Sequence, residues 1–145
     1  MRDILKKLRD KLGSDFPKII TLCGSTKFKR EYIETARDEA LKGHIILSVG
    51  FFTHAEGHSI IPEIKEKLDK LHKQKIDLSD EILVLTVDGY IGSSTLSEIL
   101  HAKENGVIIK CKCYLVEFTK EIAKKRIEEV VGEYVLYSTT YLIIE

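Results

Sequence analysis

The sequence predicts an α/β domain with a mainly parallel sheet of four to five strands. Short apolar runs alternate with longer segments of helical periodicity, and this alternation favours parallel strands joined by right-handed helical crossovers. The run 81–87 (Glu-Ile-Leu-Val-Leu-Thr-Val) is almost wholly apolar, as expected of a central strand that is covered on both faces. The chain has 145 residues, of which 43% are hydrophobic, so we expect residues 1–145 to form one domain with its own core.

The expected elements follow one another with short connections. The apolar runs that we expect to form strands are 18–23, 45–48, 81–87, 107–116 and 134–144. The segments whose apolar residues recur every three or four positions, and which we expect to form helices, are 3–12, 27–42, 62–76, 95–105 and 118–131. Gly43 and Gly106 suit the ends of two of these helices, and Pro62 suits the first turn of another.

The composition argues against several classes of function. Lys+Arg and Asp+Glu both number 23, so the chain lacks the basic excess that proteins need to coat nucleic acid. The three cysteines have no regular spacing, which favours free thiols in a reducing cytoplasm over a disulfide framework. No apolar run approaches the roughly 18 residues of a membrane span, and the N-terminus lacks a signal core. We therefore expect a cytoplasmic protein without a nucleic-acid or membrane partner.

The carboxyl ends of the expected strands locate a functional site. In open parallel sheets, ligands bind beyond these ends. Here they are the segments 23–25, 49–50 and 88–94. We therefore expect residues of these three segments to line one cleft.

The turn Gly24-Ser25-Thr26 is the first candidate for ligand contact. Glycine allows a sharp turn and a close approach of the backbone to a ligand. Ser25 or Thr26 either caps the following helix or helps its neighbouring N–H groups to hold an anion. The turn has neither a Walker Gly-Lys-Ser/Thr nor a Gly-x-Gly-x-x-Gly pattern, so we expect no dinucleotide and no other cofactor.

The segment 89–98 is the second candidate. Its closely spaced small residues follow a buried strand and can form an anion nest. Those that we expect to contact a ligand are Gly89, Gly92, Ser93 and Ser94. We expect Glu98 in the first turn of a helix, where a carboxylate beside a cleft can act as a nucleophile. The spacing Thr95-x-x-Glu98 also fits a capping box, in which Glu98 only stabilises the helix.

The remaining candidates each have an ordinary structural alternative. His72 and Asp77 precede the central strand and either face the cleft or are solvated. Cys23 ends an inner strand and contacts either a ligand or the core. Phe51 and its neighbour Phe52 follow a strand and stack on a base or join the core.

No metal site is expected from the spacing of histidines and cysteines. His54 and His58 do not form a His-Glu-x-x-His pattern, and Gly57 disfavours a helix between them. Cys111-x-Cys113 places two thiols on one face of a strand, which is not a zinc spacing.

Three segments together resemble the nucleoside 2-deoxyribosyltransferase superfamily, most closely its branch of small bacterial and archaeal proteins. They are Thr21-Leu22-Cys23-Gly24-Ser25, the strand from Asp80 to Val87, and the Gly/Ser loop that ends in Glu98. The match covers roughly residues 18–110 and leaves residues 111–145 as a C-terminal extension. It implies a flavodoxin-like Rossmann three-layer sandwich, usually a dimer or larger, that binds a small nucleoside or nucleotide.

The resemblance also implies a chemistry. Enzymes of this superfamily cleave the N-glycosidic bond of 2′-deoxynucleosides. A glutamate attacks C1′ of the sugar, and a base or water then resolves the glycosyl-enzyme. Glu98 matches that glutamate, and Gly24 and Ser25 match the turn that holds the sugar or its 5′-phosphate.

Three positions depart from the superfamily pattern. Thr21 stands where these enzymes have a tyrosine, and His72 and Gly92 stand where they have aspartates. His72 can donate a proton to the leaving base, since imidazole titrates near neutrality. Asp69 and Asp77 are alternative proton donors.

Two functional hypotheses follow. The first is an enzyme that cleaves or transfers the N-glycosidic bond of a nucleoside or nucleoside 5′-monophosphate, with Glu98 as nucleophile. The cluster Ser93-Ser94-Thr95 favours the phosphorylated ligand. The second is a non-catalytic nucleotide sensor that uses the same cleft, and the three departures favour it. Under either hypothesis we expect a homodimer or larger homo-oligomer.

Overall fold

The computed structural model describes residues 2–53, 55–57, 59–132 and 135–141, and its fold is α/β as predicted. All strand pairs are parallel, in the order β2-β1-β3-β4-β5. This is the flavodoxin-like strand order. The strands are β1 (Ile19–Cys23), β2 (Ile45–Leu47), β3 (Glu81–Val87), β4 (Ile108–Leu115) and β5 (Val135–Tyr141).

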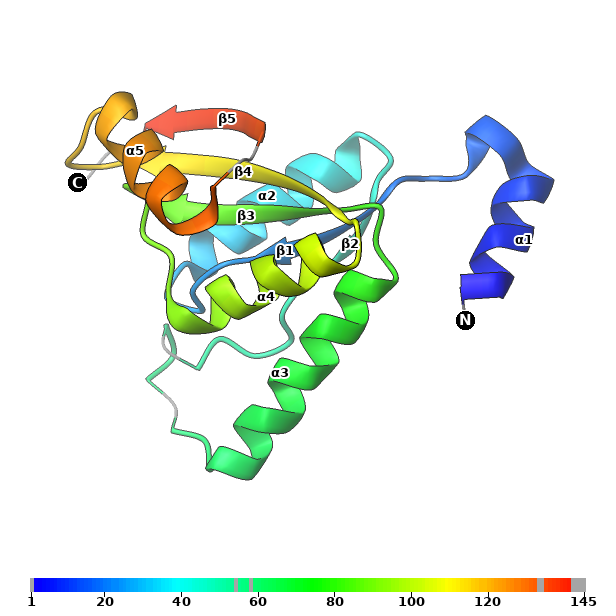
Figure 1. The fold of residues 1–145 in the computed structure, drawn as a ribbon, viewed down its shortest axis with the longest axis horizontal. Coiled ribbons are helices and arrows are strands. Elements are labelled where there is room, and N and C mark those ends of the chain that lie inside the picture. Colours follow the sequence, from blue (N-terminus) through cyan, green and yellow to red (C-terminus); the bar gives the residue numbers. More distant parts are fainter. Residues whose placement is uncertain (1, 54, 58, 133–134, 142–145) are drawn as a thin grey trace.

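The helices are α1 (Arg2–Leu12), α2 (Lys29–Leu41), α3 (Pro62–Asp77), α4 (Ser93–Glu104) and α5 (Lys120–Val131), and a short 3-10 turn η1 (Gly13–Asp15) follows α1. All of the α-helices except α1 cover the sheet, on both of its faces (Figure 1). The described parts of α3, α4 and α5 pack on one face, and α2 packs on the other. The result is the three-layer arrangement that the alternation of elements predicts.

The central strand β3 shows why both faces need a cover. Ile82 and Val84 belong to the core beneath α3, α4 and α5, whereas Leu83 and Leu85 belong to the core beneath α2. Successive side chains of a strand point to opposite faces. Because β3 presents apolar side chains to the cores on both faces of the sheet, the strand is buried on both sides.

Two aspartates at the ends of β3 fix neighbouring segments. The carboxylate of Asp80 accepts the N–H of Ile19 at 2.8 Å, which aligns β1 with β3, and it also pairs with Arg9 of α1 at 2.6 Å. Asp88 has a positive φ of 51°, and its carboxylate accepts backbone N–H groups of the segment 116–118 at 2.9 to 3.3 Å. The Asp88 carboxylate at the end of β3 therefore holds the segment that follows β4.

Several helix starts differ from the sequence prediction by one or two residues, and two of the differences bear on the site. α4 begins at Ser93 with Gly92 as N-cap, two residues before the predicted start. The predicted capping box is therefore wrong, because Thr95 lies buried inside the helix and Glu98 lies in its second turn. α2 begins only at Lys29, so the turn 24–26 stands apart from the helix, and a helix-capping role for it is also wrong.

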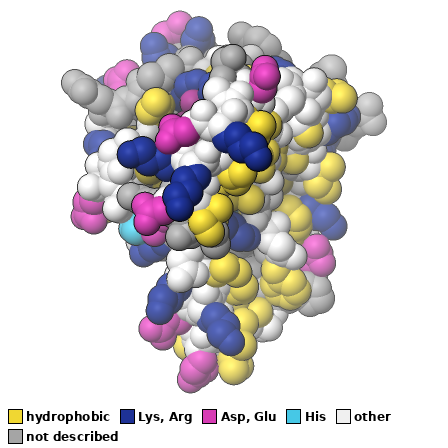
Figure 2. Space-filling model, turned by 90° about the vertical axis from the view of Figure 1, so that its right-hand side faces the viewer, with side chains coloured by type: hydrophobic (Ala, Val, Ile, Leu, Met, Phe, Trp, Pro, Cys, Tyr) yellow, Lys and Arg dark blue, Asp and Glu magenta, His cyan; other side chains and the backbone are white. Residues whose placement is uncertain are grey.

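α1 lies apart from the sheet and is joined to it by an extended segment (Figure 1). The side of the molecule on which α1 lies carries a band of hydrophobic side chains among charged ones (Figure 2). The large apolar residues that α1, α3 and the residue before α3 leave exposed are Ile4, Leu8, Leu12, Ile61, Ile64 and Leu71. Such surfaces are common at interfaces between subunits, and a homo-oligomer remains a prediction. Among the described residues, no helix has both the length and the apolar character to cross a membrane.

Candidate functional site

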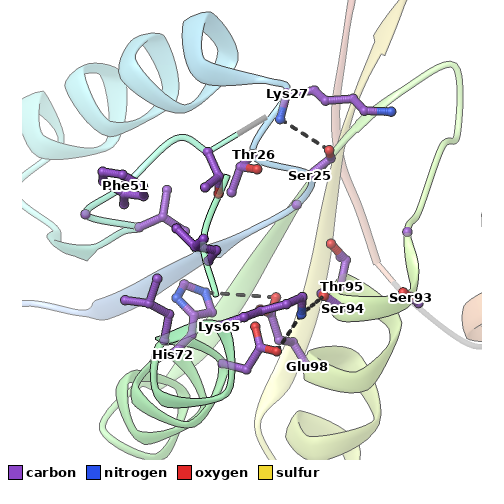
Figure 3. A pocket seen from close by; sticks show the side chains of 18 of the residues that line it. Ser25, Thr26, Lys27, Phe51, Lys65, His72, Ser93, Ser94, Thr95 and Glu98 are labelled. Atoms are coloured by element: carbon purple, nitrogen blue, oxygen red, sulfur yellow. Dashed lines mark hydrogen bonds and ion pairs between the residues drawn. The ribbon is translucent and has the colours of Figure 1, made fainter. Parts of the chain in front are cut away.

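A cleft of about 560 Å³ lies beyond the carboxyl ends of β1 and β3, where the sequence places the site. The loop after β2 and the helices α3 and α4 complete its walls (Figure 3). The predicted site residues that line it are Gly24, Ser25, Thr26, Phe51, His72, Gly92, Ser93, Ser94 and Glu98. Three segments far apart in the sequence thus meet in one cavity.

Three predicted site residues lie elsewhere. Asp77 accepts a hydrogen bond from Nε2 of His101 at 2.8 Å and does not line the cleft. Gly89 packs against α5, where an added Cβ would lie 2.7 Å from the carbonyl oxygen of Ala123. Cys23 is fully buried and lies behind two cleft residues, as described below. His54 and His58 fall outside the described residues.

Gly24 shapes the floor of the cleft. Its φ is 149°, and a Cβ at this position would lie 2.7 Å from the carbonyl oxygen of Leu85. The carbonyl oxygen of Gly24 accepts a hydrogen bond from the Tyr32 hydroxyl at 2.7 Å. Only glycine fits so close to β3 in this conformation. The Ser25 hydroxyl accepts the N–H of Lys27 at 3.2 Å, which tightens the turn.

Glu98 is the most strongly perturbed carboxyl of the cleft. Its side chain is 13% exposed. Its pKa is raised to about 7: burial raises it most, the hydrogen bond from the Cys23 thiol and the charges of Lys73 and Lys65 oppose the rise, and the charge of Asp69 adds to it. The same burial holds the pKa of the Cys23 thiol well above its usual range. Near neutral pH, Glu98 therefore exists in both its neutral and its ionised form.

His72 is buried and neutral. Its Nε2 lies 2.9 Å from the carbonyl oxygen of Leu22, and because a carbonyl only accepts, Nε2 carries the proton. Burial and the charge of Lys75 lower the pKa of His72 to about 4. The same Nε2 lies 4.0 Å from Oε2 of Glu98. A neutral imidazole whose N–H is already donated to the backbone is a poor proton donor to a ligand.

Lys65 is a cleft residue that the sequence prediction did not name, and Asp69, which it names only as an alternative proton donor, also lines the cleft. The Lys65 ammonium donates to Asp69 at 2.7 Å and to the Ser94 hydroxyl at 3.3 Å. Together with His72 these residues lie on one face of α3, with spacings of four and three residues that place side chains in register on a helix. These spacings from His72 are the sequence signal that would have predicted Lys65 and Asp69 on the same helix face.

The two consecutive phenylalanines after β2 have different surroundings. Phe51 lines the cleft and is 41% exposed. Phe52 packs edge-on against Tyr32, with ring centroids 5.5 Å apart, and belongs to the core beneath α2. Phe51 alone is therefore placed to contact a ligand.

Thr21 has a structural role in the described structure. It is fully buried, and its hydroxyl hydrogen-bonds to the carbonyl oxygen of Lys75 at 3.2 Å and to the Ser79 hydroxyl. It joins β1 to the end of α3 and does not line the cleft. Thr21 therefore supplies no group to the cleft.

The fold and the cleft define an α/β protein of flavodoxin-like strand order with a carboxylate-bearing pocket at its strand ends. Comparisons with protein-family models, with curated proteins and with solved structures found no match.

Proposed function

We propose that the protein cleaves or transfers the N-glycosidic bond of a nucleoside or nucleoside 5′-monophosphate, with Glu98 as nucleophile. The observation that carries this proposal is the position of Glu98, a carboxylate that is only 13% exposed and lines a cleft of about 560 Å³. That volume falls within the roughly 300–1,000 Å³ of small-molecule sites. The apolar ring of Phe51 and the hydroxyls of Ser25 and Ser94 line the same cleft, so it offers surfaces for both a base and a sugar.

The proposed reaction proceeds in two steps. The Glu98 carboxylate attacks C1′, the N-glycosidic bond breaks, and the base leaves with the bonding electrons and takes up a proton. The result is a glycosyl ester of Glu98. Water or a second base then attacks C1′ and releases the carboxylate.

Asp69 is the better placed carboxyl for the proton that the leaving base needs. It lines the cleft, and its side chain is 43% exposed. Asp77 bonds to His101 outside the cleft, and the N–H of His72 is donated to Leu22. The Asp69 carboxylate accepts a hydrogen bond from the Lys65 ammonium at 2.7 Å, so we propose that it passes to the leaving base a proton that it takes from solvent. His72 has a positioning role beside Glu98.

The groups at the mouth of the cleft favour a phosphorylated ligand. Lys65 brings a cation next to Ser94, and Ser93 lines the cleft at the first position of α4. Ammonium, hydroxyl and helix N-terminal N–H groups are the donors that bind phosphate. We therefore propose a nucleoside 5′-monophosphate as the preferred substrate.

The test is a screen of deoxynucleosides and deoxynucleoside 5′-monophosphates with chromatographic detection of the free base. We expect base release by the wild type, and loss of release in Glu98→Gln. His101→Ala is the matched control, because it removes a polar partner of α3 outside the cleft and should leave base release intact. Ligand-dependent thermal stabilisation without any base release would instead support the nucleotide sensor. The observation that favours the sensor is that His72 is neutral and donates its N–H to the backbone of Leu22.

A further inference from the structure

Three metal-ligating side chains converge at the base of the cleft. They come from the end of β1, from α3 and from α4, and are Cys23, His72 and Glu98. Their ligand atoms all lie within 4.8 Å of one another. The Cys23 Sγ lies 3.7 Å from Nε2 of His72, and Oε2 of Glu98 lies 4.0 Å from the same nitrogen.

These separations are close to those that a tetrahedral ion imposes on its ligands. Zinc bonds of about 2.3 Å to sulfur and about 2.0–2.2 Å to nitrogen and oxygen place neighbouring ligand atoms about 3.4–3.6 Å apart. The distance from Cys23 to His72 exceeds these values by a few tenths of an ångström and that from His72 to Glu98 by about half an ångström, whereas the ligand atoms of Cys23 and Glu98 lie within 4.8 Å of each other. Closing the site requires the Cys23 and Glu98 side chains to rotate toward each other and Nε2 of His72 to turn away from the Leu22 carbonyl.

The chemistry of the donor set selects the class of ion. A thiolate and an imidazole favour zinc and other borderline-soft divalent ions over magnesium or calcium, which prefer oxygen ligands. Three protein ligands beside an open cavity are the pattern of zinc sites that keep one position for water or substrate. His72 and Glu98 both line the cleft, so the fourth position faces it.

We propose that Cys23, His72 and Glu98 form a three-ligand site for a zinc-class divalent ion at the base of the cleft. The proposal does not depend on the proposed glycosidic chemistry. If the metal site and the glycosidic chemistry are both correct, the ion binds the Glu98 carboxylate that attacks C1′, and zinc therefore inhibits base release.

Metal binding requires a defined exchange of protons. The Cys23 thiol releases its proton to solvent, as does Glu98 wherever it is protonated. His72 gives up the proton on Nε2 and takes one from solvent on Nδ1, so that its net charge is unchanged. The hydrogen bond from Nε2 to Leu22 is thereby exchanged for a bond to the ion.

The experiment is a titration of chelator-treated protein with Co²⁺ and, in parallel, with Zn²⁺ by calorimetry. Co²⁺ reports on its own ligands through its spectrum. We expect one equivalent to bind, with the visible bands of a tetrahedral ion and a near-ultraviolet thiolate-to-cobalt band. The thiolate band should vanish in Cys23→Ser, and affinity should fall by about 100-fold or more. Cys111→Ser is the matched control, because Cys111 is equally buried in the same core and its replacement should preserve the band.

Further readouts keep the test independent of catalysis and of variant folding. In the wild type, ¹⁵N spectra of histidine should show the proton of His72 on Nε2 without metal and on Nδ1 with zinc. Weak or non-stoichiometric binding, an octahedral cobalt spectrum, or equal binding by Cys23→Ser would overturn the proposal. Base release by chelator-treated protein decides the proposed function separately, whatever the titration shows.

Discussion

Glu98 and His72 bring a carboxylate oxygen and an imidazole nitrogen to 4.0 Å from each other, yet the N–H of the histidine is donated to the backbone of Leu22. Burial drives both groups toward their neutral forms, since it raises the pKa of Glu98 to about 7 and lowers that of His72 to about 4. The pair is therefore not a stable salt bridge at neutral pH.

Base release by the metal-free enzyme should rise with pH and level off above about pH 7, because the nucleophile must be ionised. With a pKa of about 7, only about 1% of Glu98 is ionised at pH 5, so the rate there should be about 100-fold below its plateau. The measurement is the initial rate of base release from pH 5 to 9 in the presence of a chelator. A rate that is flat over this range contradicts the role of Glu98 as nucleophile.

Glu98→Gln should stabilise the fold at alkaline pH. The folded-state pKa of Glu98 is raised above its ordinary value of 4.5, so the free energy of unfolding falls as pH rises from about 4.5 through about 7. A neutral amide avoids this loss, and the free energy of unfolding at pH 8 should rise by about 2–3 kcal/mol. Urea unfolding at pH 8 and pH 5 measures the difference, which should shrink at pH 5. An equal effect at both pH values would show that ionisation is not the cause.

Lys65→Gln should weaken binding of a nucleoside 5′-monophosphate by about 10-fold, because a charge-assisted contact contributes on the order of 1.4 kcal/mol. Binding of the matching nucleoside, which lacks the phosphate, should change little. Calorimetry with both ligands measures the two affinities. Lys67→Gln is the matched control, since Lys67 lies on the same helix and does not line the cleft. An equal loss of affinity for the monophosphate and for the nucleoside would show that the phosphate does not contact Lys65.

Glu39→Gln should destabilise the protein at neutral pH and have less effect in acid. The carboxylate of Glu39, whose side chain is 3% exposed, accepts from Tyr137 at 2.7 Å and contacts His44 at 2.8 Å and Lys42 at 3.1 Å. Burial alone would raise its pKa, but these hydrogen bonds outweigh burial, and the pKa is lowered. Its contribution is therefore present above pH 4.5 and is lost as pH falls.

The loss at pH 7 should be about 1–3 kcal/mol, the cost of leaving buried partners unsatisfied. Urea unfolding of wild type and variant at pH 7 and pH 3.5 provides the measurement. Glu34→Gln, on the same helix, is the control and should be close to neutral at both pH values. A deficit that persists undiminished at pH 3.5 would contradict the pH dependence.

Much of the fold could be read from local patterns. The predicted strand 81–87 coincides with β3, because burial on both faces leaves a nearly continuous apolar run in the sequence. The predicted start of α4 at residue 95 was wrong, because Gly92 caps the helix without a side-chain hydrogen bond and leaves no clear sequence signal. The parallel topology placed the cleft at the ends of β1 and β3, as predicted.

By itself the sequence determined the alternation of strands and helices, the parallel sheet and the residues at its carboxyl ends, because side-chain periodicity and turn chemistry are local properties. Only the tertiary structure decided that Asp69 lines the cleft while Asp77 does not, and that Cys23, His72 and Glu98 come together. These relations depend on the rotation of α3 and on the packing of three distant segments. Burial then sets the ionisation of the groups, and burial is a property of the assembled fold.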